Sequence, residues 1–266
     1  MSRLQKFKAK MAEAGFDAVV LSSAVNQRYM TGFDYTDGYV VITKNKSYVL
    51  ADFRYIEAAR NTVNAEEYEI VMPEGSMLVN VAAILDENEC KTVSFEDVTL
   101  SVADLERMKK VFVGNELVPG ASKLADGLRL YKDEEEIEKI KKAQAITDAG
   151  FTHMLEWLTP NVTEIEAALE LEFFMRRMGS EGIAFDTIAV SGSASSLPHG
   201  VPRNVKIEKG FFTFDFGAKF DGYCSDMTRT VVVGKADEDM KKLYNTVLSA
   251  QLAALDYLKE GADCGE

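Results

Sequence analysis

Hydrophobic positions in the first half of the chain follow two different spacings. Leu4, Phe7 and Met11 recur every three or four positions among lysines, a period that predicts an amphipathic helix over residues 2–14. Gly15 suits the left-handed residue that often follows a helix. Short apolar runs then alternate with further helical patterns. Together they predict an α/β domain with a mixed sheet.

The other elements of this first half follow from the same patterns. Two apolar runs flank Asn45-Lys46 and predict a hairpin. Ser101 and Asp104 have the spacing of a helix cap. We expect strands at 17–22, 38–44, 47–52, 68–72 and 92–95, and helices at 53–63, 77–85 and 101–111.

The pattern is interrupted at residues 119–130, where proline, glycine and small residues gather. We place a domain boundary near Leu128 to Lys132. The predicted domains are therefore residues 1–128 and residues 129–266.

The second domain begins with two predicted helices and then changes to strands. Acidic residues in the first turn suit the start of the first helix, and Thr163 with Glu166 has the spacing of a capping box in the second. We expect helices at 132–157, 163–178 and 238–258, and strands within 185–192, 211–220 and 223–233.

Composition narrows the class of protein. The 266 residues are 47% apolar, which supports a substantial core, and no run is long and apolar enough to span a membrane or serve as a signal peptide. A cytoplasmic protein is expected. A net charge of −13 argues against nucleic-acid binding. Cys90, Cys224 and Cys264 are too widely spaced to predict a disulfide framework or a thiolate zinc site.

Two aspartates flank a predicted turn in residues 210–233. The turn residues Asp221-Gly222 are typical of a tight hairpin. A turn centred there pairs Asp226 with Gly217, diagonal to Asp215, whereas a turn one residue earlier pairs the two aspartates directly. Both registers place the carboxylates on one face, opposite the apolar face of the first strand. An intermediate register would separate them.

Carboxylates that share a strand face repel each other and need compensation. A divalent cation supplies it, and paired carboxylates that bridge two metal ions are a common hydrolytic site. The spacing alone is explained equally well by one solvated aspartate and one that caps a turn.

The two histidines differ in their surroundings. His199 lies between Pro198 and Gly200 in a predicted loop, where a catalytic role is possible although lone histidines are more often structural. His153 lies within a predicted helix, and we interpret it as a packing residue.

Longer segments resemble a known family. FDTIAVSGSASSLPHGVP and FFTFDFGAKFDGYCSDMTRT are similar to the signature region of the M24 peptidases, whose catalytic domain has the pita-bread (α+β) fold. NQRYMTGF at 26–33 and ADFRYIEAAR at 51–60 resemble the creatinase/prolidase N-terminal domain. The resemblance implies a creatinase-like mixed-sheet α/β domain, then the first half of a pita-bread domain. It also implies a metal-dependent peptidase that cleaves Xaa-Pro bonds at the N-terminus of peptides, either an aminopeptidase or a dipeptidase (prolidase).

The resemblance also assigns roles to residues. Asp215 would hold one metal ion, Asp226 would bridge two, and His199 would help to stabilise the reacting carbonyl. Thr228 is placed to support Asp226. The implied cofactor is a pair of divalent ions, manganese first and cobalt or zinc as alternatives. The implied partners are a proline-containing peptide and a second copy of the chain in a homodimer.

The chain departs from the family where further metal ligands are required, namely one histidine and two glutamates. No histidine follows His199, and Glu238, Glu260 and Glu266 lack the family's surrounding sequence. We therefore expect an incomplete form of the enzyme, inactive alone and binding metal weakly or not at all. The alternatives are a non-catalytic binding module with this fold and a metal-free, creatinase-like hydrolase, which the two aspartates disfavour.

Overall fold

The computed structural model describes residues 1–265. They form two compact units, unit 1 (Met1–Lys132) and unit 2 (Asp133–Glu266). Each unit buries its own apolar residues, so each has the packing of a domain.

Unit 1 is built on a sheet of six strands. The strands are β1 (Ala18–Leu21), β2 (Gly38–Thr43), β3 (Ser47–Ala51), β4 (Glu69–Val71), β5 (Thr92–Phe95) and β6 (Glu116–Pro119). Their order is β4-β3-β2-β1-β5-β6. β1, β2 and β3 pair antiparallel, while β3–β4, β1–β5 and β5–β6 pair parallel. The predicted mixed sheet and its hairpin are confirmed.

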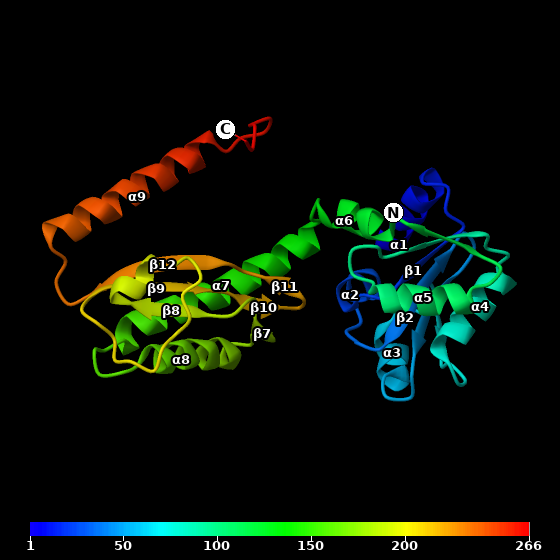
Figure 1. Ribbon diagram of the computed structural model, residues 1–266, viewed down its shortest axis with the longest axis horizontal. Helices are drawn as coiled ribbons and strands as arrows, with labels where there is room; N and C mark the ends of the chain where they lie inside the picture. Colours follow the sequence, from blue (N-terminus) through cyan, green and yellow to red (C-terminus); the bar gives the residue numbers. More distant parts are fainter. Residues whose placement is uncertain (266) are drawn as a thin grey trace. The chain divides into compact units, whose positions relative to one another are not determined.

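Helices pack on both faces of this sheet (Figure 1). They are α1 (Arg3–Glu13), α2 (Ala24–Thr31), α3 (Ile56–Thr62), α4 (Met77–Glu87), α5 (Val102–Val111) and α6 (Ala121–Arg129). Val19 and Leu21 of β1 join the core with α1, α2, α3 and α6, whereas Ala18 and Val20 join the core with α4 and α5. The alternation of side chains along β1 therefore divides unit 1 into three layers.

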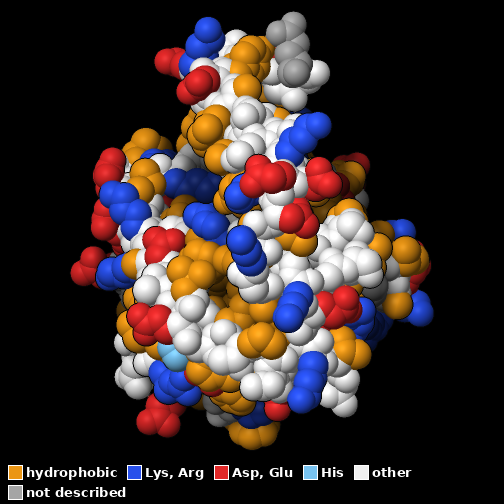
Figure 2. Space-filling model, turned by 90° about the vertical axis from the view of Figure 1, so that its left-hand side faces the viewer, with side chains coloured by type: hydrophobic (Ala, Val, Ile, Leu, Met, Phe, Trp, Pro, Cys, Tyr) orange, Lys and Arg blue, Asp and Glu red, His pale blue; other side chains and the backbone are white. Residues whose placement is uncertain are grey.

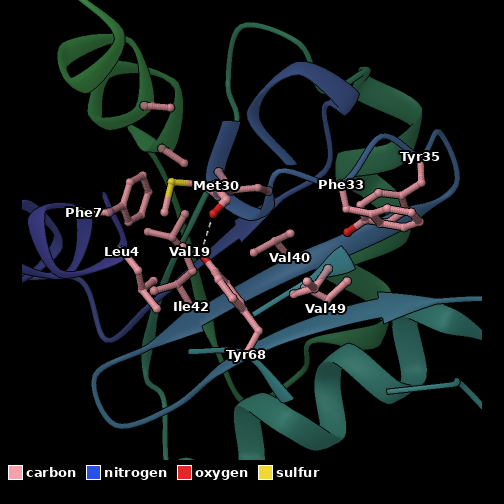
Figure 3. Packing of buried hydrophobic residues seen from close by; sticks show 14 of the residues in the cluster. Leu4, Phe7, Val19, Met30, Phe33, Tyr35, Val40, Ile42, Val49 and Tyr68 are labelled. Atoms are coloured by element: carbon pink, nitrogen blue, oxygen red, sulfur yellow. Dashed lines mark hydrogen bonds between the residues drawn. The ribbon is translucent and has the colours of Figure 1, made fainter. Parts of the chain in front are cut away.

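Aromatic side chains are buried in the core that α1 covers (Figure 3). Phe7 of α1 is fully buried in the same cluster as Leu4 and Met30. Tyr68 donates its hydroxyl to the carbonyl oxygen of Met30 at 3.0 Å (Figure 3). This bond satisfies the polar tip of a buried tyrosine and ties α2 to the start of β4.

Three elements of unit 1 are not predicted by the pattern. α2 buries the polar side chains of Asn26 and Gln27, so its inner face lacks an apolar period. The expectation of an interruption at 119–130 was wrong, because β6 ends at Pro119 and α6 follows over Ala121–Arg129. Ala121 and Ala125 of α6 are fully buried in the core it shares with α1. Small residues here permit close packing and do not mark a loop.

Unit 2 begins with two long helices, α7 (Glu134–Trp157) and α8 (Glu164–Arg177). Asp133 caps α7, and Thr163 with Glu166 forms the predicted capping box of α8. Both predicted helices are confirmed.

The strands of unit 2 form two three-stranded sheets. They are β7 (Gly182–Ile183), β8 (Ile188–Ser191), β9 (Gly210–Phe216), β10 (Ala218–Phe220), β11 (Tyr223–Cys224) and β12 (Met227–Val233). The sheets have the orders β12-β9-β8 and β11-β10-β7. One long hairpin passes from one sheet into the other at Gly217, where an added Cβ would lie 1.9 Å from the backbone oxygen of Ser225. Only glycine fits this close approach.

The two faces of the β12-β9-β8 sheet have different surroundings. Phe212, Phe214 and Phe216 are fully buried in the core that α7 and α8 form, as the alternation predicts. Thr213 and Asp215 alternate with them and are only partly buried. The second face is therefore the one available for chemistry.

The last helix, α9 (Glu238–Tyr257), confirms a predicted helix but buries none of its residues. Leu243, Val247 and Leu252 are all exposed. Hydrophobic side chains lie open among charged ones on the face of the molecule drawn in Figure 2. Although α9 is long, neither it nor any other helix within residues 1–265 is apolar enough to cross a membrane.

Replacing Gly217 tests the close approach within the hairpin. We expect Gly217→Ala to lower the free energy of unfolding of unit 2 by about 3 kcal/mol, because the Ser225 backbone must shift. Urea unfolding followed by fluorescence measures this change, since Trp157 is the only tryptophan and packs against the core of unit 2.

The matched control is Gly182→Ala in the same unit. The nearest atom to a Cβ at Gly182 is a guanidinium nitrogen of Arg176 at 3.6 Å, which can move away. We expect this variant to stay within about 1 kcal/mol of the parent chain. Equal stabilities for the two variants would contradict the structural reason given for Gly217.

Candidate functional site

The site starts from the register of the long hairpin. Asp221 and Gly222 have positive φ angles of 46° and 82°, as a two-residue type I′ turn requires. The strands on both sides keep the register that this turn sets, and Thr228 stands directly opposite Asp215. Of the two simple registers predicted, the structure has the one centred on Asp221-Gly222.

Asp226 lies in the bend between β11 and β12. The strand pairs before and after the bend share one register, so Asp226 lies opposite Gly217 and diagonal to Asp215. Along β9, Asp215 points away from the phenylalanines. Asp226 directly precedes Met227, which is buried opposite Phe216, so we infer that the Asp226 carboxylate lies on the Asp215 side. The Asp226 side chain is exposed there.

Threonine hydroxyls surround Asp215. Thr228 Oγ1 donates to Asp215 Oδ1 at 2.8 Å, and the hydroxyls of Thr213 and Thr230 lie 3.0 Å apart on the same face. The sequence argument had Thr228 supporting Asp226, but the register puts its hydroxyl against Asp215. Within residues 1–265, no lysine or arginine forms an ion pair with Asp215 or Asp226. Two negative charges thus share a face without a protein cation.

His199 lies in the loop that follows β8. Val190 of β8 stands opposite Thr213, so its side chain is on the Asp215 side of the sheet. Gly200 packs on that side chain, because an added Cβ would lie 3.2 Å from both methyl groups of Val190. The loop therefore packs on the Asp215 side of the sheet at Val190, and the His199 side chain is exposed.

The other histidine has contacts of a different kind. The His153 ring stacks on Phe174 with 4.2 Å between ring centroids. Its Nε2 lies 2.7 Å from Oε1 of Glu170. These contacts join α7 to α8, in agreement with the packing role inferred from the sequence.

A buried carboxylate holds both ends of the His199 loop. Glu164 is the first residue of α8, and its side chain has 0% exposure. Oε1 accepts hydrogen bonds from the Ser191 amide and hydroxyl at 2.7 Å each. Oε2 accepts from the Arg203 amide at 2.9 Å and from its Nε at 2.8 Å. The sequence pattern did not single out Glu164, because an acidic residue in a first helical turn is already explained by the helix dipole.

The same contacts set the charge of Glu164. Burial would raise the pKa of its carboxyl, but the hydrogen bonds from Arg203 and Ser191 outweigh burial and hold the pKa at about 2. Glu164 is therefore ionised at neutral pH.

Known proteins match this chain in two segments. The family model for the creatinase/prolidase N-terminal domain matches residues 3–131, and that for metallopeptidase family M24 matches residues 138–266. The uncharacterized peptidase YqhT of Bacillus subtilis is 38% identical over 260 residues, which are 97% of this chain and 73% of the relative. The chain belongs to metallopeptidase family M24.

Other M24 relatives agree in sequence and in fold. The Xaa-Pro dipeptidase of Pyrococcus furiosus is 33% identical over 99% of this chain and 74% of its own length. The solved Xaa-Pro dipeptidase from Bacillus anthracis has a TM-score of 0.89 and 41% identity, covering 94% of this chain and 69% of that one. The prolidase from Pyrococcus horikoshii has a TM-score of 0.86 and 31% identity, covering 96% and 72%. The predicted creatinase-like α/β domain followed by a pita-bread domain is confirmed.

Membership in a metallopeptidase family implies divalent metal ions. The side chains of this site provide some, but not all, of the ligands that such ions need. Asp215 and Asp226 offer hard oxygen donors of the kind that manganese accepts. Across residues 1–265, however, no group of three or more histidine, cysteine, aspartate or glutamate side chains gathers where an ion could be held. Two carboxylates can hold one ion but cannot fix the separation of two.

The lowered pKa of Glu164 predicts a pH dependence of stability. Its folded pKa of about 2 lies below the ordinary 4.5, so this stabilisation is complete above pH 4.5 and is lost as the pH falls towards 2. The shift corresponds to about 3 kcal/mol. We expect the difference in unfolding free energy between the parent chain and Glu164→Gln to shrink by that amount between pH 5 and pH 2.

The measurement is urea unfolding followed by Trp157 fluorescence across this pH range. Glu156→Gln makes the same change of charge at an exposed position of α7 and serves as the control. A difference for Glu164→Gln that stays constant down to pH 2 would show that the carboxylate is not stabilised by its charge.

Proposed function

We propose that this chain belongs to a metal-dependent peptidase that cleaves Xaa-Pro bonds at the N-terminus of peptides, as an aminopeptidase or dipeptidase. One observation carries the proposal: the hairpin register brings Asp215 and Asp226 to the same stretch of the hairpin, and within residues 1–265 no lysine or arginine forms an ion pair with either. Burying or crowding like charges is unfavourable unless a cation compensates. The 33% identity to the Pyrococcus furiosus Xaa-Pro dipeptidase supports the same substrate class.

Each residue of the site has a proposed role. Asp215 and Asp226 would bind divalent metal, manganese first and cobalt or zinc as alternatives, and Thr228 would orient Asp215 through its hydrogen bond. His199, from the loop above this face, would donate a hydrogen bond to the carbonyl oxygen of the scissile peptide bond. Bound metal would supply an activated water and a polarised carbonyl.

A non-catalytic binding module is the second candidate. It is favoured by the lack of a third metal-binding side chain near the aspartates within residues 1–265. Such a module would bind proline-containing peptides on the same face without turnover. Metal binding and hydrolysis, measured separately, distinguish the two candidates.

The proposed ligands predict a weak manganese site. We expect this chain to bind Mn²⁺ with a dissociation constant on the order of 10⁻⁴ to 10⁻³ M, because few carboxylates contribute. Asp226→Asn should weaken binding at least about 10-fold, since one of two negative charges is removed. Electron paramagnetic resonance of free Mn²⁺ measures both values.

Asp86→Asn is the matched control, because it makes the same change at an exposed position of α4 in unit 1. It should leave the affinity for Mn²⁺ unchanged. If Asp226→Asn and Asp215→Asn also bind Mn²⁺ as the parent does, the metal assignment is wrong.

Turnover is predicted to be much lower than that of the Bacillus anthracis dipeptidase. With Mn²⁺ present, we expect the 266-residue chain to hydrolyse an Xaa-Pro dipeptide and a longer Xaa-Pro peptide at less than about one hundredth of the rate of the Bacillus anthracis dipeptidase. The physical reason is that two aspartates cannot hold two ions at a fixed separation. If the two proteins hydrolyse these peptides at comparable rates, the inference that this chain lacks part of the metal-binding set is wrong. Peptide binding with no detectable hydrolysis would favour the binding module.

A further inference from the structure

The loop of residues 192–202, which carries His199, is held at its ends. Its first turn is the short helix η1 (Gly192–Ser196). Among residues 1–265, the hydrogen bonds that residues 192–202 form connect them to one another and not to the rest of unit 2. His199 has no hydrogen-bond partner among residues 1–265. The position of its imidazole therefore depends on how the loop is anchored.

Both anchors meet at one side chain. Ser191, the last residue of β8, directly precedes the loop, and Arg203 directly follows it. Glu164 accepts hydrogen bonds from the backbone amides of both, at 2.7 and 2.9 Å. Arg203 also donates from a terminal nitrogen to the Ser191 carbonyl at 3.2 Å. A single carboxylate thus joins the two ends of the loop.

The start of α8 contributes a second set of bonds to the returning chain. The backbone amide of Ile165 donates to the Arg203 oxygen at 3.3 Å, and that of Glu164 donates to the Val205 oxygen at 3.1 Å. These bonds use amides that a helix leaves free in its first turn. They fix the segment after the loop to the same helix that supplies the carboxylate.

Capping of α8 does not require Glu164. Thr163 and Glu166 already exchange the two bonds of the capping box. A fully buried carboxylate is unfavourable unless its geometry is well satisfied, and here it accepts bonds from residues on both sides of one loop. Its partners, more than its place in the helix, account for its position.

We propose that Glu164, together with Arg203, is a positioning residue that closes loop 192–202 and keeps His199 over the face that carries Asp215 and Asp226. The functional meaning of this contact rests on the proposed role of His199. A Glu164 that only stabilises unit 2 would, when replaced, speed amide exchange throughout unit 2 alike. A positioning Glu164 contributes to that stability and in addition controls the motion of this loop while the rest of unit 2 stays folded.

Nuclear magnetic resonance of the chain separates these two roles. Only two histidines are present, so the imidazole signals of His199 and His153 can be assigned with a His153→Gln variant. In Glu164→Gln we expect amide exchange across residues 192–202 to become at least about 10-fold faster, and the His199 ring to become mobile. The His153 ring and the amides of α7 should keep their parent values.

Glu166→Gln is the matched control, because it removes the same charge from the same helical turn, and within residues 1–265 the Glu166 side chain accepts hydrogen bonds from Thr163 alone. It should leave the exchange rates of the loop and the signals of His199 unchanged. If Glu164→Gln does not fold, Arg203→Gln breaks the same link from a side chain that is 40% exposed. In the parent chain, the amides of Ser191 and Arg203 should be protected.

Unchanged exchange across residues 192–202 in a folded Glu164→Gln or Arg203→Gln variant would overturn the proposal. Unprotected Ser191 and Arg203 amides in the parent chain would overturn it as well. Hydrolysis of an Xaa-Pro dipeptide is the separate readout of function, where Glu164→Gln should lower kcat at least about 10-fold with little change in KM. The two proposals can also fail separately. If Glu164→Gln releases the loop but the chain shows no hydrolysis, the positioning role of Glu164 is supported and the proposed peptidase function is not.

Discussion

The turn at Asp221-Gly222 is the constraint on which the site depends. Two consecutive residues with positive φ close the hairpin and fix the pairing of every residue in its two arms. Because side chains alternate, a pairing shifted by one residue would place Asp226 across from Phe216, on the buried side, whereas the same two-residue turn moved by one position would not. The pairing register that the turn sets therefore decides whether the two carboxylates share a face. Gly217 allows the arms to change sheets without losing that register.

The opposite face of the same strand makes this arrangement possible. Three consecutive inward positions of β9 are phenylalanines, fully buried against α7 and α8. The apolar area they bury stabilises the strand, which can then carry Asp215 outward beside a second negative charge. A strand without such a core would gain little from keeping two carboxylates together. Repulsion on one face is thus balanced by packing on the other, and the remaining charge makes the open face attractive to cations.

Local rules predicted those parts of the fold that local contacts determine. The capping box of α8 and the hairpin at Asn45-Lys46 involve neighbours in sequence, so their boundaries were found closely. α2 was missed because it buries two polar side chains: Asn26 donates to Glu96, which is 70 positions away, and Gln27 donates to the Ser22 carbonyl oxygen. α6 was missed because alanines fit a close helix contact and also fit a loop. In both cases the helix is determined by tertiary packing and not by local sequence preference.

The candidate site divides in the same way. The shared face of Asp215 and Asp226 follows from strand alternation and a turn, both of which can be read along the sequence. The contact between Glu164 and Arg203 joins residues 39 positions apart, and neither residue type predicts it. A helix-start glutamate and a loop arginine are each common for other reasons. What distinguishes them is that one buried carboxylate meets the residues on both sides of the same loop. Such a role exists only in the folded chain. Sequence patterns could therefore predict that two aspartates share a face, but they could not predict the contact that holds the loop near it.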